Sequence, residues 1–274
     1  MDLEKNGYRL VWNDEFDGDT LDMDKWTLRP DMGSNAQTSL AGLERPDVLS
    51  VSDSLLQMNA VEDGALPDGR KHYTVCYSVT TFNKMHFQYG YVEIRAKVPY
   101  MQGAWPSFWM KSVSGDISPR YVWDYRVEVD VFEVFSSPNK AVPNIHKWYE
   151  DKRHTQMASY QKKFYAFENY ENLSEEFHIY GFQWTPEEMS MWIDGNKYAT
   201  YDLSYDFDGG GDMKGFHDPL YILFNNYIFT PSCYFKPEGC LVDERTRFPI
   251  NYSVDWIRLY QREGEGALYL PKGV

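Results

Sequence analysis

The 274-residue chain is predicted to be all-β, a sandwich of two antiparallel sheets in a single domain, residues 1–274. Many short runs of β-branched and aromatic residues are separated by turn signals, which is typical of sandwiches. Few segments have helical periodicity over a useful length. No internal repeat or linker divides the chain, and a β sandwich can reach this length as one domain.

The N-terminal half is predicted to consist of strands and two loops. Residues 48–60 form a strand pair around a turn at Ser52-Asp53, because polar residues there separate two apolar runs. Residues 30–47 and 62–71 are predicted loops, since they hold Gly, Pro or Ser without periodicity. The other predictions are a strand at 8–13, strands dominating 73–99 and a turn-rich segment at 101–109.

The C-terminal half is also predicted to be strands. Asp194-Gly195 between two strand-like runs is a strong hairpin signal. Loops are expected at 112–125 and at the Gly/Asp-rich 206–214. Residues 143–149 (PNIHKWY) and a polar stretch to about residue 160 precede predicted strands at 177–184, 188–193, 197–201, 220–224 and 252–261.

Composition excludes several classes of function. The net charge is −14 and no basic stripe is present, which argues against nucleic-acid binding. No run of eighteen apolar residues exists, so no membrane span is expected. Aromatic residues make up 17% of the chain, which fits either a sugar-lined cleft or aromatic strands.

The N-terminus and the cysteines leave alternatives open. The opening MDLEKNGYRLVW has no apolar signal core, so the protein is cytosolic or a leader has been removed. Three cysteines do not form a disulfide framework. Cys233 and Cys240 are close enough in sequence to pair across a loop.

The most informative stretch is RVEVDVFEVF, residues 126–135, in which apolar and acidic residues alternate. Glu128 and Asp130 share one face of the predicted strand. Glu133 falls on the other face in a regular strand, and Val131 and Phe132 are adjacent apolar residues. One extra residue, a β-bulge, returns Glu133 to the acidic face and both apolar residues to the core.

Three clustered carboxylates repel one another and raise at least one pKa, which suits an acid–base pair in a glycosidase. The Cα atoms of Glu128 and Glu133 lie roughly 13 Å apart in such a strand. Carboxyl separations of about 5–6 Å (retaining) and about 6.5–9.5 Å (inverting) both remain open. An exposed acidic edge strand or half of a cation site is the alternative.

Several stretches together resemble glycoside hydrolase family 16, and within it the laminarinase-like clade. The matching segments follow the family's order along most of the chain: VWNDEFDG (11–18), FQYGYVEIRAKVP (87–99), GAWPSFWM (103–110), EVDVFE (128–133), FQWTPEEMSMWIDG (182–195) and VDWIRLYQ (254–261). The resemblance implies a β-jelly-roll of two curved antiparallel sheets with a concave substrate cleft. It also implies endo-acting hydrolysis of internal β-linkages with retention, no required cofactor, and no nucleic-acid partner.

By motif position, the resemblance assigns Glu128 as nucleophile and Glu133 as general acid/base. It assigns Asp130, which lies between them, as the residue that adjusts the pKa values of the two glutamates. It implies substrate contacts at Trp105 and His146, and core packing competes with this role at Trp109 and Trp148. Two segments of this chain differ from the usual family sequence where the family's cleft lies. They lead us to expect further cleft residues, namely Asn225, Asn226, Tyr227, Phe229, Tyr121, Trp123 and Tyr125.

A structural calcium is a further expectation, because Glu15 and Asp255 match positions that help to bind one in relatives. Two side chains alone do not make a calcium site, since the ion takes six to eight oxygens. Two ordinary surface acids are the alternative.

Two substrate classes remain open, β-1,3-glucan (laminarin-like) and β-1,4-galactoside (poly-LacNAc, O-glycan or galactan). The segments that depart from the usual family sequence border the substrate cleft in the family, so they bear on specificity. A transglycosylase with the same site, or a non-catalytic glycan-binding module, are the alternatives to the hydrolase. The family also leads us to expect a monomer that is secreted, periplasmic or at the cell surface.

Overall fold

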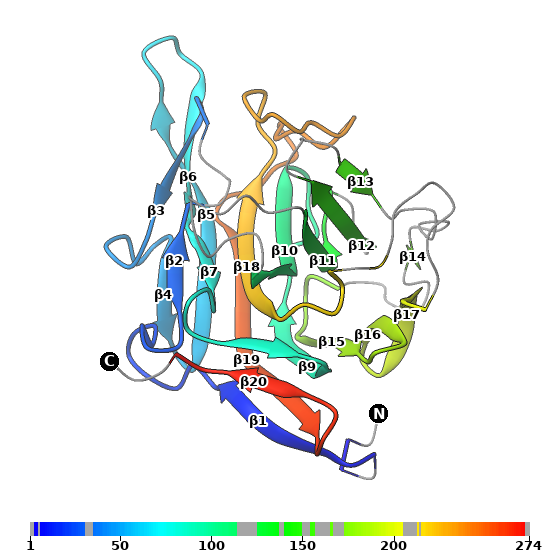
Figure 1. Cartoon of the computed structure of the whole chain (residues 1–274). Coiled ribbons are helices and arrows are strands. Elements are labelled where there is room, and N and C mark those ends of the chain that lie inside the picture. Colours follow the sequence, from blue (N-terminus) through cyan, green and yellow to red (C-terminus); the bar gives the residue numbers. More distant parts are fainter. Residues whose placement is uncertain are drawn as a thin grey trace.

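The computed structural model describes residues 3–4, 6–30, 35–113, 125–136, 140–149, 154–156, 165–166, 173–204, 213 and 215–271. These residues form strands and no helix, arranged in two sheets of ten strands each (Figure 1). The predicted all-β sandwich is therefore confirmed. No helix in the described ranges is long and apolar enough to cross a membrane.

The back sheet has the order β17-β16-β15-β9-β19-β5-β6-β3. All of its pairs are antiparallel except β3 with β6. Its strands are β17 (Asn196–Asp202), β16 (Glu188–Ile193), β15 (His178–Trp184), β9 (Gly90–Lys97), β19 (Ile250–Arg262), β5 (Leu55–Ala65), β6 (Lys71–Cys76) and β3 (Thr38–Ala41), with β1 (Tyr8–Asp14) on β19 and β4 (Leu49–Ser52) on β5.

The front sheet has the order β13-β12-β11-β10-β18-β7-β2. Its strands are β13 (His154–Gln156), β12 (Lys140–Tyr149), β11 (Tyr125–Glu133), β10 (Ala104–Ser112), β18 (Leu220–Ile228), β7 (Ser78–Thr80) and β2 (Thr27–Arg29), with β14 (Tyr165–Ala166) on β12, β8 (His86–Gln88) on β18 and β20 (Ala267–Tyr269) on β8.

The main hydrophobic core lies between the two sheets and follows the period-2 alternation of their strands. On β10, Phe108 and Met110 are fully buried in this core, as are Ile257 and Leu259 on β19. Burying one such side chain contributes about 1.5–3 kcal/mol. The intervening residues of β10 therefore face the opposite side of the front sheet, which we call its outer face.

The hairpin at Asp194-Gly195 is confirmed. It joins β16 to β17, and both residues have positive φ, 46° and 77°. A two-residue turn with two left-handed residues matches the twist of the flanking strands, and glycine accepts that conformation without strain.

Three local predictions were wrong. The sequence predicts a turn-rich segment at 101–109, but β10 begins at Ala104 and lies at the centre of the front sheet. The Gly and Pro signals there are outweighed by pairing on both sides with β11 and β18. The loop predicted at 30–47 contains β3, and β5 extends to Ala65, into the loop predicted at 62–71.

Some expectations lie largely outside the described residues, including the loops at 112–125 and 206–214. Tyr121 and Trp123, expected to line the cleft, are among the residues not described. The possible pair between Cys233 and Cys240 is not formed, because both are free thiols.

Candidate active site

The predicted bulge is present in β11 and centres on Val131. On β10, Trp109 is opposite Asp130 and Phe108 is opposite Phe132, so Val131 has no cross-strand partner. The register with β12 shifts in the same interval. Val131 and Phe132 are both fully buried in the main core, which places Glu133 on the outer face with Glu128 and Asp130.

A tyrosine of the back sheet supports this bulge. Tyr198 of β17 is buried in the main core, and its hydroxyl donates a hydrogen bond to the Val131 carbonyl. A bulge interrupts the ladder that satisfies backbone groups, and an unsatisfied buried carbonyl costs about 1–3 kcal/mol. Tyr198 thus stabilises the one irregularity that positions Glu133. Sequence gave no local signal for this contact, because it joins two sheets.

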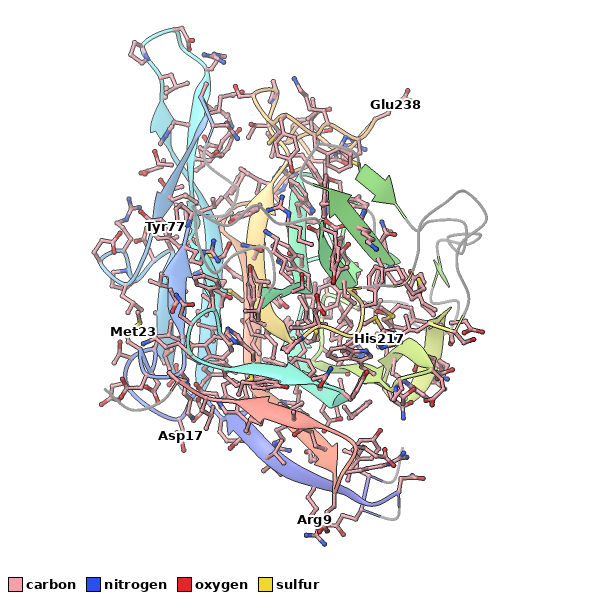
Figure 2. The ribbon with its side chains drawn as sticks, viewed as in Figure 1. Arg9, Asp17, Met23, Tyr77, His217 and Glu238 are labelled. Atoms are coloured by element: carbon pink, nitrogen blue, oxygen red, sulfur yellow. The ribbon has the colours of Figure 1, made fainter. Side chains whose placement is uncertain are left out.

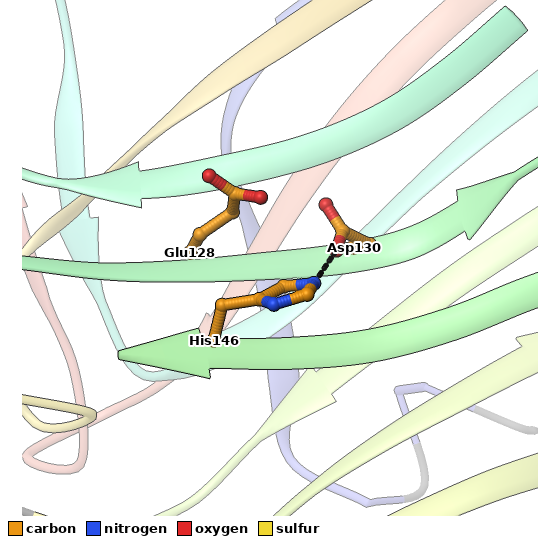
Figure 3. A group of neighbouring side chains, drawn as sticks. All are labelled: Glu128, Asp130 and His146. Carbon is orange, nitrogen blue, oxygen red and sulfur yellow. Dashed lines mark ion pairs between the residues drawn. The ribbon is translucent and has the colours of Figure 1, made fainter. Parts of the chain in front are cut away.

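His146 of β12 lies directly opposite Glu128 and forms an ion pair with Asp130. Its Nε2 is 3.1 Å from Asp130 Oδ2, and ligand atoms of Glu128, Asp130 and His146 all lie within 4.8 Å of one another (Figure 3). Nε2 is also 2.7 Å from Asn144 Nδ2. A protonated Nε2 donates to Asp130, whereas a neutral Nε2 accepts from Asn144.

The carboxylates favour the protonated imidazole. Burial lowers the pKa of His146, but the hydrogen bond to Asp130 and the charges of Asp130, Glu128 and Glu133 outweigh it and raise the pKa to about 9. His146 is therefore cationic at neutral pH. A protonated Nε2 has no lone pair for a metal, so this cluster suits an internal ion pair better than a metal centre.

Glu133 is half-buried and accepts a hydrogen bond from Trp105, with Nε1 2.9 Å from Oε1. Burial, and then the charge of Asp130, raise its pKa well above the usual value, against the effect of the Trp105 bond. This environment favours a protonated carboxyl, the form that a general acid requires.

Glu128 also has a raised pKa, caused by burial and then by Asp130. Three cations oppose the rise, namely His146, Lys111 and Arg126. Lys111 is the cross-strand neighbour of Glu128 on β10. The cations accumulate at the Glu128 end of the site, so ionisation is favoured more at Glu128 than at Glu133.

Trp105 lies beside Glu133, as expected, but is only 6% exposed. Its ring is stacked on Phe229 with centroids 4.6 Å apart. One ring face is therefore covered by protein, and little of the ring is left to contact a ligand.

Three predicted substrate contacts lie beneath the surface of the outer face. Trp109, Asn225 and Tyr227 are 3%, 1% and 2% exposed. Trp109 Nε1 donates to Asn225 Oδ1 at 2.5 Å, Asn225 bonds Ser78, and the Ser78 and Tyr227 hydroxyls are 2.8 Å apart. Since these polar atoms satisfy one another, the arrangement favours a supporting layer over direct contact with substrate.

Asn226 was expected to face the same subsite, and this was wrong. It points between the sheets, where Nδ2 donates to the carbonyls of Met58 and Ile250 at 2.7 and 2.8 Å. Neighbouring residues of a strand point to opposite faces. Trp148 does lie on the outer face, half-buried, with its ring centroid 6.0 Å from that of His146.

The residues proposed for calcium do not fit a calcium site. Both oxygens of Glu15 bond the Arg258 guanidinium at 3.0 and 2.7 Å, and Asp255 forms an ion pair with Arg95. The Arg258 hydrogen bond lowers the pKa of Glu15. Each carboxylate is already neutralised by an arginine, which would have to be displaced.

Comparison with known proteins agrees with the fold and the motif. A family model described as "Beta-porphyranase A-D, GH16 domain" matches residues 11–262. The chain belongs to glycoside hydrolase family 16. The predicted family is thus confirmed on a match that includes β11 and its three carboxylates.

Characterised relatives of this family 16 chain act on different glycans. The beta-glucanase of Rhodothermus marinus is 28% identical, over 93% of this chain and 85% of the relative. The glucan endo-1,3-beta-glucosidase A1 of Niallia circulans is 24% identical over 94% of this chain, which spans only 38% of that protein. The keratan-sulfate endo-1,4-beta-galactosidase of Sphingobacterium multivorum is 25% identical, over 93% of this chain and 55% of the relative.

Solved structures share the fold. The laminarinase catalytic domain of Thermotoga maritima superimposes with a TM-score of 0.72 at 22% identity, covering 94% of this chain and 99% of the other. SCLam, a non-specific endo-beta-1,3(4)-glucanase of family GH16, gives a TM-score of 0.68 at 26% identity, covering 93% and 95%.

Proposed function

We propose that this protein is an endo-acting, retaining β-glycoside hydrolase that cleaves internal linkages of a β-linked polysaccharide or long glycan. The observation that carries the proposal is the bulge at Val131, which places Glu128, Asp130 and Glu133 on one face. The raised pKa of Glu133 beside an ion-paired Asp130 supports different roles for the two glutamates.

In the proposed first step, the Glu128 carboxylate attacks the anomeric carbon while Glu133 donates its proton to the departing glycosidic oxygen. The C–O bond breaks and a covalent glycosyl-enzyme forms. In the second step Glu133, now ionised, takes a proton from water as the water oxygen attacks the anomeric carbon and releases Glu128. Two inversions give net retention.

Asp130 and His146 are proposed to control the proton of Glu133. The negative charge of Asp130 raises the pKa of Glu133 and so disfavours early loss of its proton. The His146 ion pair holds Asp130 in place at 3.1 Å. Trp105 fixes the orientation of the Glu133 carboxyl through its indole N–H.

A β-1,4-galactoside and a β-1,3-glucan are the two proposed substrate classes. The porphyranase-type family model, matched over residues 11–262, supports the galactoside. The glucanase relatives support the glucan. We propose action on glycans outside the cytoplasm by a monomer, which cell fractionation and light scattering would test.

The deciding experiment is incubation with laminarin, mixed-linkage glucan, agarose, porphyran and mucin-type glycans, followed by sizing of the products. We expect one class to be shortened internally, and the first-formed anomer to be β by NMR. Glu128→Gln should abolish turnover, by ~10⁴-fold or more, while the fold persists. Full activity in that variant would refute the assignment.

The same product analysis separates two alternatives. Products longer than the starting oligosaccharide would indicate a transglycosylase. A family relative, the beta-1,3-glucan-binding protein of Penaeus monodon (24% identical over 58% of this chain), is named for binding. Binding without cleavage of any glycan in the panel would favour that reading here.

A further inference from the structure

Two exposed aromatic residues lie in a segment that contacts Trp105, the hydrogen-bond partner of Glu133. The segment after β18 contains Tyr234 and Phe235, which are 79% and 41% exposed. Figure 2 labels Glu238, which belongs to the same segment, at the upper right of the view, above β13. Exposed aromatic surface of this kind is unfavourable in water and commonly marks a binding site. We call these two residues the aromatic lip.

Ring contacts connect the aromatic lip to Glu133. The Phe235 ring centroid lies 5.7 Å from that of Trp105 and 5.8 Å from that of Phe135. Trp105 in turn donates its hydrogen bond to Glu133. Phe235 is therefore separated from the proposed acid by a single side chain, at the end of β11 that is farther from Glu128.

Tyr234 lies within electrostatic reach of the site. Partial desolvation of its hydroxyl, and then the charges of Glu128 and Glu133, raise the pKa of Tyr234 to about 12, although most of the side chain is exposed. The phenol is therefore un-ionised at neutral pH, and a ligand that reaches this side chain would meet an uncharged ring.

The segment is fastened on both sides of the aromatic lip. The Val242 N–H donates to the Phe229 carbonyl at 2.8 Å, and Ser136 Oγ donates to the Cys240 carbonyl at 2.5 Å. Gln102 Nε2 donates to the carbonyls of Gly239 and Leu241 at 2.8 and 2.6 Å. A fixed platform loses less entropy when it binds a ligand than a free loop does.

We propose that the aromatic lip is a sugar-binding subsite, in which Tyr234 and Phe235 stack on the apolar C–H face of one pyranose of the substrate, at the Glu133 end of the site. This inference rests on the proposed function, because it assigns the ligand from the adjacent carboxylates. A neutral or weakly polar pyranose fits the site, since the neighbouring acids repel an anionic ring.

The test compares Tyr234→Ala and Phe235→Ala with Tyr269→Ala. Tyr269 is 45% exposed on β20, which pairs with β8, and serves as an exposed aromatic outside the site. For each variant, kcat and KM are measured on the cleaved polymer and on the shortest oligosaccharide that is still cleaved. We expect the lip variants to raise KM for the polymer ~10-fold more than for the short substrate, with kcat nearly constant. Tyr269→Ala should behave as the wild type.

The outcomes separate this inference from the proposed function. Equal losses on polymer and short substrate, or no change in KM, would overturn the subsite while the hydrolase stands. If wild type cleaves no glycan, Glu128→Gln and its double variant with Tyr234→Ala are compared by affinity electrophoresis in gels containing each polysaccharide. Equal retardation in every gel would then overturn the subsite as well. Tyr234→Phe, which keeps the ring, should bind more tightly than Tyr234→Ala.

Discussion

Two groups of carboxylates in this structure have opposite surroundings. Beside the back sheet, Glu15 and Asp255 each face an arginine. On the front sheet, within the ranges the structure describes, His146 forms an ion pair with Asp130, while Lys111 and Arg126 act on Glu128 through their charge. Arg258 lowers the pKa of Glu15, whereas burial and Asp130 raise the pKa of Glu133.

The opposite pKa shifts of Glu15 and Glu133 indicate that the first carboxylate stabilises the fold and that the second serves the proposed reaction. A carboxylate with a lowered pKa stabilises the fold above its unfolded pKa, and this contribution is lost as pH falls through the folded pKa. A carboxyl with a raised pKa contributes at low pH, and its contribution is lost as pH rises through the folded pKa. Glu133 therefore reduces stability at neutral pH, where Glu15 increases it.

The largest expected effect comes from Glu133→Gln. Loss of the general acid should lower kcat by ~10²–10⁴-fold on natural glycans. The same change removes a buried, repelled carboxyl, so Tm at pH 7 should rise, by about 2–4 °C for each kcal/mol gained. Activity assays and calorimetry test the two halves separately. A lower Tm at pH 7 would contradict the proposed difference between Glu133 and the carboxylates paired with arginine.

Tyr198→Phe should have the next largest effect, because it leaves the Val131 carbonyl without its donor. We expect a loss of about 1–3 kcal/mol in the free energy of unfolding and a fall in kcat with little change in KM. Tyr252→Phe is the matched control, since the buried Tyr252 hydroxyl has no hydrogen-bond partner among the residues that the structure describes. Denaturant melts of both variants measure the difference, and equal losses would exclude a special role for Tyr198.

The pH profile of kcat/KM should be bell-shaped. Activity falls at low pH when Glu128 becomes protonated and at high pH when Glu133 becomes ionised. Lys111 lowers the pKa of Glu128, so Lys111→Met should move the acidic limb to higher pH by a fraction of a unit and leave the basic limb in place. A shift of the basic limb alone would assign the roles in reverse.

The smallest effects are expected beside the back sheet. Glu15→Gln and Asp255→Asn should each lower stability by about 0.2–1 kcal/mol without changing kcat. For Glu15→Gln the loss should shrink at low pH, because Arg258 lowers the pKa of Glu15. Thermal melts with and without a chelator test the calcium expectation in the same samples. A clear fall of Tm on chelation would show that a metal, rather than the arginines, neutralises these acids.

The bulge was predictable from sequence, whereas its supports were not. Glu128, Asp130 and Glu133 break the alternation of a regular strand at one point, and the adjacent apolar pair Val131 and Phe132 locates the extra residue. That signal is local. The Tyr198 hydrogen bond and the Phe229 stack on Trp105 join residues that are distant in sequence, so no local pattern contains them.

Two errors have instructive causes. Gly103 and Pro106 are local turn signals, but pairing with strands on both sides makes residues 104–112 the strand β10. Asn225 and Asn226 were placed on the same face, although alternation alone separates adjacent residues of a strand. Avoiding the first error requires knowledge of which strands pair in the sheet, whereas avoiding the second requires only the alternation of side chains along a strand.

The position of β10 between β11 and β18 has a consequence for the newly synthesised protein. Trp109 and Asn225, which are hydrogen-bonded, lie 116 residues apart in sequence, and Phe229 and Phe235 are still later. During synthesis on the ribosome, Glu128, Asp130 and Glu133 are made long before Asn225, Phe229 and Phe235, which pack beside the site. Such distant pairing slows folding, so catalytic competence should emerge late and abruptly during biosynthesis.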